Sequence, residues 1–213
     1  MSDHRDANDV RAAFESALGG EYFALTGLRA GTTTESSARA SMFFTTLTGT
    51  LLALGFLAGN TEAAVPVAYA AVPTIALLGL LNFLRLVELA VLDVRALQAI
   101  QRIRGYWRDL VPDGPTFFPA PAPGQALDIV LDTGERRGAF RATLTIAVTV
   151  GTMDSLWVGA GVGFAVADRG VSTGGAVAVG AAVGVALIAA MFWHQTRRFL
   201  AVVGDQDVPP TVA

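Results

Sequence analysis

The sequence predicts an all-α, polytopic membrane protein, in which a four-transmembrane-helix bundle carries a cytoplasmic helical extension and both termini face the cytoplasm. Three observations lead to this fold class. Hydrophobic residues make up 53% of the chain and charged residues only 15%, whereas about a quarter of the residues of soluble proteins are charged. Four long stretches are almost free of charge, and the arginines are distributed unevenly among the segments between them.

The four uncharged stretches are long enough to cross a bilayer. The first two contain no charged side chain, the third contains only Asp154, and the fourth contains no ionisable side chain except His194. Each meets or exceeds the roughly 20 apolar residues that cross a hydrocarbon layer. We therefore predict transmembrane helices near residues 39–60, 64–85, 141–167 and 172–195.

The arginines predict the orientation of these spans. The chain has no lysine, and of its 15 basic residues only Arg169 lies outside the N-terminal segment, the segment between spans two and three, and the C-terminal segment. Cytoplasmic loops carry the excess of basic residues, so these three segments are expected inside the cell. Arginine without lysine, together with much Ala, Gly and Val, is typical of a GC-rich bacterial genome and favours a bacterial inner (plasma) membrane.

The polar segments divide the chain further. Residues 1–38 are expected to form a cytoplasmic or interfacial helix, interrupted at Gly19-Gly20. Thr32 with Glu35 fits a capping box, which would start the next helix. The remaining parts are spans one and two with their extension, a proline-rich cytoplasmic linker, spans three and four, and a cytoplasmic tail, at residues 39–110, 111–138, 139–198 and 199–213.

Span two is predicted to continue as one helix from about Val65 to Leu110. No Gly or Pro occurs between Asn82 and Ile103, and apolar residues recur there at intervals of three and four. Such a helix is roughly 65 Å long, and about half of it projects into the cytoplasm. The projection needs a packing partner, either the N-terminal helix or another subunit, and it suits assembly or gating.

Glycines in spans three and four have the spacing that lets membrane helices approach closely. Gly159 and Gly163 form one such pair, and Gly180 and Gly184 form the other. The spacing predicts tight helix packing without distinguishing contacts inside one chain from contacts between chains.

Asp154 is expected near the middle of the bilayer, because uncharged residues fill its span on both sides. A carboxylate at that depth costs about 2.5–3.5 kcal/mol on the insertion scale. One interpretation is a proton or cation site, or a ring of acids lining the pore of an oligomer. The other is a protonated acid that holds helices together by a hydrogen bond to a Thr or to Asn82.

Other polar side chains in or near spans one and two are candidate site residues. Thr46 and Thr50 of span one, with Asn82, are candidates for a pore or ion path, although Thr in a membrane helix often bonds to its own i−4 carbonyl. Arg85 and Glu88 are one turn apart and form either a cytoplasmic gate or a solvated helix exit. Phe117-Phe118 in the linker either docks on a partner or packs on the domain's own surface.

The sequence contains no motif for an enzyme or a cofactor. It has no cysteine and therefore no thiolate metal site, and His194 lacks neighbouring metal-ligating residues. No phosphate loop, dinucleotide fingerprint or activated nucleophile is present. The formal net charge of −3 gives no indication of a nucleic-acid partner.

The plan of residues 6–110 resembles the SLATT-type membrane effectors of bacterial nucleotide-signalled antiphage systems. It has an N-terminal helix, two close spans with a short outer loop, and a long helix that continues span two; Arg29 and Arg39 precede the first span. Spans three and four depart from that plan. The resemblance implies membrane permeabilisation by an oligomer and assigns no site residues.

The expected function is therefore an ion channel or membrane-permeabilising pore, formed by a homo-oligomer in the lipid bilayer. The alternative is a non-conducting scaffold or signalling component whose cytoplasmic helices and linker dock a cytoplasmic protein partner. A small transporter is the third expectation.

Overall fold

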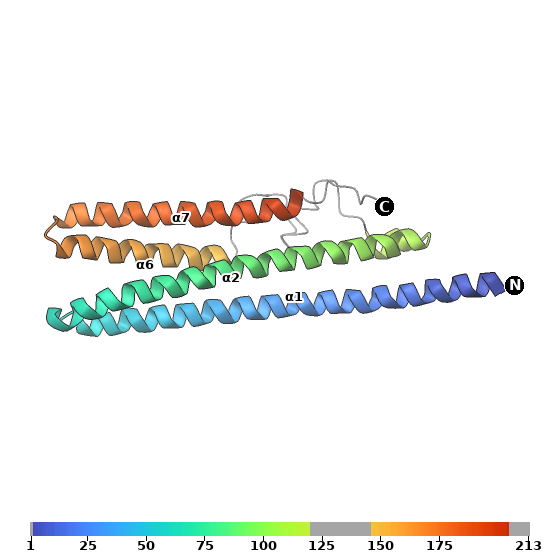
Figure 1. Cartoon of the computed structure of the whole chain (residues 1–213), viewed down its shortest axis with the longest axis horizontal. Helices are drawn as coiled ribbons and strands as arrows, with labels where there is room; N and C mark the ends of the chain where they lie inside the picture. Colours follow the sequence, from blue (N-terminus) through green and yellow to red (C-terminus); the bar gives the residue numbers. More distant parts are fainter. Residues whose placement is uncertain (1, 120–145, 205–213) are drawn as a thin grey trace. The chain divides into compact units, whose positions relative to one another are not determined.

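The computed structural model describes residues 2–119 and 146–204, and within these ranges the chain is helical and contains no strand (Figure 1). The helices are α1 (Ser2–Leu57), α2 (Thr61–Leu110), the short α3 (Gly114–Phe117), α6 (Ile146–Asp168) and α7 (Thr173–Gly204). The predictions for most of the linker, for the start of span three and for residues 205–213 lie outside the described residues.

The four long helices each contain a segment that is long and apolar enough to cross a membrane. They are α1, α2, α6 and α7, which correspond in chain order to the four predicted spans. The all-α fold and the four candidate membrane-spanning helices are therefore confirmed.

Helix α1 is continuous where the sequence predicted breaks. It runs from Ser2 to Leu57 through Gly19-Gly20, because a glycine costs only about 1 kcal/mol relative to alanine inside a helix. The helix start expected at Thr32 was wrong. The Thr32 hydroxyl donates to the carbonyl of Arg29 at 2.8 Å, and a capping box needs unpaired backbone N–H groups, which the interior of a helix does not have.

Helix α2 runs from Thr61 to Leu110, so span two and its extension form one helix. The Asn60 side chain accepts a hydrogen bond from the Ala63 backbone N–H at 3.3 Å, which caps the start of the helix. The chain then divides into two compact units. The extension unit comprises residues 1–34 and 90–138, and the span unit comprises residues 35–89 and 139–213.

In the extension unit, the second half of α2 packs against the first half of α1. Tyr106 contacts Phe14 with ring centroids 5.6 Å apart, and Trp107 lies 5.4 Å from Tyr22. The packing partner that the extension needs is therefore the N-terminal helix of the same chain. Phe118 also packs on Trp107, at 5.7 Å, whereas Phe117 is exposed.

In the span unit, α1 and α2 form one helical hairpin, and α6 and α7 form a second (Figure 1). Phe43, Phe83 and Val150 are among the most deeply buried side chains of a core to which α1, α2 and α6 all contribute. The Tyr69 hydroxyl donates to Asp168 at 2.9 Å, which links the start of α2 to the end of α6. The turns of the two hairpins therefore lie at the same end of the span unit.

Candidate functional site

Asp154 lies on α6 and faces α2 of its own chain. Its relative exposure is 2%, and it lies against Gly79. A Cβ built on Gly79 would overlap the Asp154 carboxyl group and lie 2.8 Å from its Cβ. The carboxyl group therefore occupies space that a side chain at position 79 would fill, and this contact does not place it in a ring between subunits.

One interpretation of Asp154 was a hydrogen bond to a Thr or to Asn82, and one of its two carboxyl oxygens makes no such bond with any residue that the structure describes. Within the described residues, Asp154 Oδ1 has no hydrogen-bond partner. The side-chain amide nitrogen Nδ2 of Asn82, one helical turn from Gly79 on α2, also lacks a partner there. Asn82 is 3% exposed. Two buried polar atoms on neighbouring helices are thus unpaired, which is rare in folded proteins.

The helix contacts around Asp154 are close and largely apolar. Gly151 lies against Phe83 of α2 and Met191 of α7. The Ser155 hydroxyl donates to the Gly151 carbonyl at 2.7 Å, and the indole N–H of Trp157 donates to the Val72 carbonyl of α2 at 3.2 Å. The Gly151 contacts and the Trp157 bond join α6 to α2 and to α7 in the part of α6 that carries Asp154.

The four glycines predicted to pack helices lie where α6 meets α7. A Cβ on Gly159 would lie 2.6 Å from the Gly180 carbonyl oxygen, and one on Gly180 would lie 2.5 Å from that of Gly159. Gly163 faces the Ala176 carbonyl, and Gly184 faces that of Ser155. All of these contacts are within one chain, a distinction that the glycine spacing alone did not make.

Thr46 and Thr50 lie apart from Asp154, on α1. Their hydroxyls donate to the i−4 carbonyls of Met42 and Thr46, at 2.8 and 2.9 Å. Each threonine therefore hydrogen-bonds to the backbone of its own helix, which is the alternative to a pore or ion path that the sequence left open.

A second group of hydroxyl residues lies on α1. The sequence indicated Thr45 and Thr48, with Thr46 and Thr50, as hydroxyls for a polar path, but not that two of them share a side with serines of the preceding turns. We call this second group the hydroxyl stripe; its members are Ser37, Ser41, Thr45 and Thr48. All four are exposed, and their spacing of four, four and three residues places them on one side of the helix. Phe43 and Leu47 are buried on a different side of the helix. Because nearly every position of the span is apolar or hydroxylated, the stripe became recognisable only once the packed side was known.

Arg85 joins α2 to α1 within the span unit through Glu35. Its Nε atom lies 3.3 Å from Glu35 Oε1, and its NH1 atom lies 3.3 Å from Glu88 Oε2. Glu35 also accepts a hydrogen bond from Arg39 at 2.8 Å. These bonds, that from Arg39 first and that from Arg85 next, hold the pKa of the Glu35 carboxyl below its usual value. Arg85 and Glu88, for which the sequence left open a gate or a solvated helix exit, are thus bonded to each other, and Arg85 also links α2 to α1.

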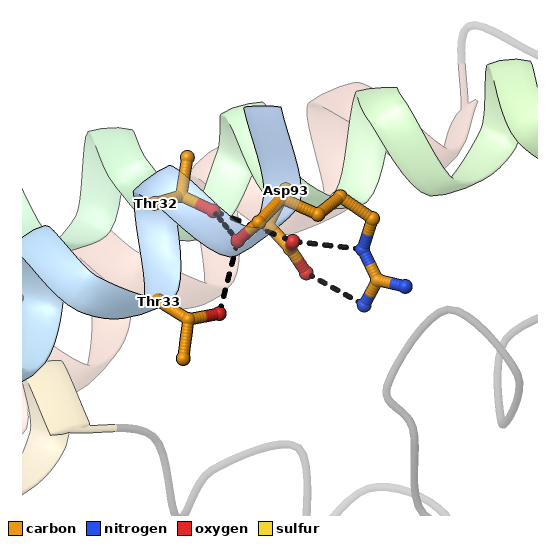
Figure 2. A network of polar contacts seen from close by, with 4 residues as sticks. Thr32, Thr33 and Asp93 are labelled. Atoms are coloured by element: carbon orange, nitrogen blue, oxygen red, sulfur yellow. Dashed lines mark hydrogen bonds and ion pairs between the residues drawn. The ribbon is translucent and has the colours of Figure 1, made fainter. Parts of the chain in front are cut away.

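A further polar contact, not predicted from the sequence, joins α1 and α2 in the extension unit. Figure 2 shows Thr32 of α1 beside Asp93 of α2, together with Thr33, whose hydroxyl donates to the Arg29 carbonyl at 3.0 Å. Arg29 donates to both carboxylate oxygens of Asp93, at 2.9 and 3.3 Å. Thr32 adds a longer contact of 3.5 Å to Asp93 Oδ1. Arg29 and Asp93 are 64 residues apart in the sequence, so helical periodicity gave no sign that they pair.

Comparisons with protein-family models, curated proteins and solved structures found no match to this chain. Among the described residues, no group of three or more His, Cys, Asp or Glu side chains is arranged to hold a metal ion.

Proposed function

We propose that the protein is the subunit of an oligomeric membrane pore, in which the hydroxyl stripe of α1 faces a water-filled path. The observation that carries the proposal is the position of the stripe. Its four hydroxyl residues lie on a side of α1 separate from the side that packs into the core, and all four are exposed. Both termini are cytoplasmic, and the membrane is the inner membrane of a bacterium.

The physical argument concerns what a hydroxyl stripe faces inside a bilayer. In hydrocarbon a hydroxyl group finds no hydrogen-bond partner beyond the carbonyls of its own helix, whereas water in a pore or a neighbouring helix offers further ones. Pores are lined by groups that can replace the water around a permeating solute. Ring-like assembly of several copies with their stripes directed inward would give such an environment to Ser41, Thr45 and Thr48, the three members inside the predicted span.

The remaining helices suit the role of a supporting wall. The close contact of α6 with α7 through Gly159 and Gly180, and the bond from Trp157 to the α2 backbone, hold three helices in fixed positions. An assembly can then place α1 at its centre without rearranging the core. The resemblance of residues 6–110 to SLATT-type effectors implies the same activity.

Cysteine substitution tests the pore directly, because the natural chain contains no cysteine. We expect Thr45→Cys and Thr48→Cys, reconstituted in liposomes, to react with a charged, membrane-impermeant thiol reagent. The reaction should reduce ion flux, because it places a bulky charged group in the path. Leu77→Cys is the control, since Leu77 is 58% exposed on α2 and lies within about one helical turn of the depth of Thr45. The Leu77→Cys side chain should remain unlabelled, because it faces lipid in the proposed assembly.

The same cysteine variants can also contradict the pore. Stripe cysteines that form disulfides between copies, yet stay protected from the charged reagent in liposomes without flux, would show that the stripe is a dry contact. That result favours the alternative function, a non-conducting scaffold. The extension unit supports this alternative, because it exposes Val10, Phe14 and Phe23 on α1, the last at 76%. Flux of one solute that saturates with its concentration would instead indicate a small transporter.

A further inference from the structure

The contact between α2 and α6 contains a buried acid that the proposed pore does not use. Asp154 is 2% exposed, its Oδ1 atom has no hydrogen-bond partner in the described part of the chain, and Gly79 provides the space that its carboxyl group fills. Asn82, one turn along α2, has an unpaired amide nitrogen and is also buried. An acid in such a place needs a counter-charge, a metal ion or a proton.

No charged side chain compensates Asp154 in the residues that the structure describes. On α2, the nearest ionisable residue is Arg85, about 9 Å along the helix from Gly79, and it is bonded to Glu35 and Glu88. On α7, His194 lies against Phe83, with ring centroids 6.4 Å apart. On α1, Glu35 and Arg39 belong to the Arg85 cluster. No ion pair with Asp154 is formed among these groups.

A metal ion fits this place poorly. Hard cations take about six oxygen ligands, and Gly79, the residue that lies against the carboxyl group, offers no side-chain oxygen. The backbone carbonyls of these helices are already engaged in helical hydrogen bonds. The unpaired group of Asn82 is an amide nitrogen, which donates a hydrogen bond and does not bind a cation.

We propose that Asp154 and the space at Gly79 form a proton-binding site between α2 and α6. The bound ligand is a single proton, which keeps the acid neutral while the helices are in contact. Release of that proton leaves a charge that the contact cannot accommodate, so α2 and α6 must separate or admit water. The site therefore couples the protonation of one carboxyl group to the packing of two membrane helices, independently of the hydroxyl stripe on α1.

A hydrophobic carbodiimide tests for the neutral acid. The acid transfers its proton to one nitrogen of dicyclohexylcarbodiimide, and its oxygen bonds to the central carbon; rearrangement then gives a stable acylurea with no atoms lost. With the full chain in bilayers, we expect mass spectrometry to find this adduct on Asp154 at acidic and neutral pH and less of it at alkaline pH. Asp154→Asn should abolish it, and saturating Na⁺ should leave it unchanged.

A water-soluble carbodiimide is the matched control. It should modify the exposed Glu88 and not Asp154. Labelling of Asp154 by the water-soluble reagent would place the acid in a water-filled path and overturn the proposal. Protection of Asp154 by Na⁺ would also overturn it, because the ligand would then be a metal cation.

Stability against pH gives a second measurement that does not require the reagent to reach the site. If the folded protein keeps Asp154 protonated, the unfolded state binds fewer protons as pH rises, so stability falls with rising pH. We expect the melting temperature of the wild type in detergent to fall relative to that of Asp154→Asn between acidic and alkaline pH. Parallel curves for the two proteins would overturn the proposal, with or without an adduct.

The space at Gly79 is tested by a pair of substitutions. Gly79→Ala should lower the melting temperature, because the new methyl group overlaps the Asp154 carboxyl group. Gly79→Ala should lower the melting temperature much less in an Asp154→Gly background, which lacks both the carboxyl group and the Cβ at 2.8 Å. Gly49→Ala on α1 is the control, since a Cβ there meets no neighbouring atom within 4 Å. An equal effect of Gly79→Ala in both backgrounds would contradict the proposed site. These readouts are separate from the flux test on α1.

Discussion

Several side chains in this protein owe their roles to partners that are distant in the sequence. Arg29 is bonded to Asp93, Glu35 to Arg85, and Tyr69 to Asp168. Each pair joins two helices, and each lies within one compact unit. A single substitution at these positions therefore affects the docking of a helix as well as a local charge.

The Arg29–Asp93 pair should stabilise the extension unit. Arg29→Gln removes two charge-assisted hydrogen bonds at a site where both side chains are about a quarter exposed. We expect a loss of about 1–2 kcal/mol, less than a fully buried pair would lose because solvent screens part of the interaction. Limited proteolysis measures this loss of stability as faster cleavage of α1 in the variant. The double variant Arg29→Asp with Asp93→Arg should recover part of the loss, and no recovery would show that the pairing is not what stabilises the contact.

The cluster around Glu35 predicts a pH dependence. Because Arg39 and Arg85 hold the pKa of Glu35 below its usual value, their contribution to stability is present above the unfolded-state pKa and is lost as pH falls through the folded-state value. Arg39→Gln should raise the pKa of Glu35 toward its ordinary value, as followed by carboxyl NMR titration. Arg95→Gln, on the extension unit, is the control and should leave it unchanged. An unshifted Glu35 in Arg39→Gln would refute the assignment.

At the scale of whole helices, the two hairpins of the span unit are held together in different ways. The α6–α7 hairpin relies on backbone contact, in which Gly159 and Gly180 face each other without side chains between them. The contact of α1 with the core relies on large side chains such as Phe43. Added volume should therefore disrupt the contact of α6 with α7 and have little effect at the open glycine positions of α1.

Gly180→Val should separate α6 from α7. A Cβ at this position already lies 2.5 Å from the Gly159 carbonyl oxygen, and overpacking of this kind costs about 1–3 kcal/mol or more. We expect a lower melting temperature in detergent. Gly55→Val on α1 is the matched control, because nothing lies within 4 Å of its Cβ position. Equal melting temperatures for Gly180→Val and the wild type would show that the close contact is absent in the folded protein.

At the scale of the whole molecule, α1 and α2 each contribute to both compact units. Helices α6 and α7 belong to the span unit alone. The Tyr69–Asp168 bond places the two hairpin turns of the span unit at the same end. The turns should therefore lie on the same side of the membrane. The excess of arginine in the other segments predicts that this side is the periplasm.

Reporter fusions test this topology. A reporter joined after Ala213, or inserted in the linker near Pro121, should give a cytoplasmic signal. A reporter inserted after Asn60 should give a periplasmic signal, because Asn60 lies in the turn between α1 and α2. A periplasmic signal at position 213 would contradict the arrangement with both termini inside.

The sequence by itself determined the membrane class, the four apolar helices and the continuous α2. A bilayer imposes these features, because a segment that spans it must be long, nearly uncharged and internally hydrogen-bonded. Only the tertiary structure decided which side of α1 is packed, that Gly159 meets Gly180 in the same chain, and that Asp154 faces Gly79. The reason is that periodicity reveals a helix face only when its sides differ in polarity. In a membrane span almost every side is apolar, so steric fit between helices selects the contacts.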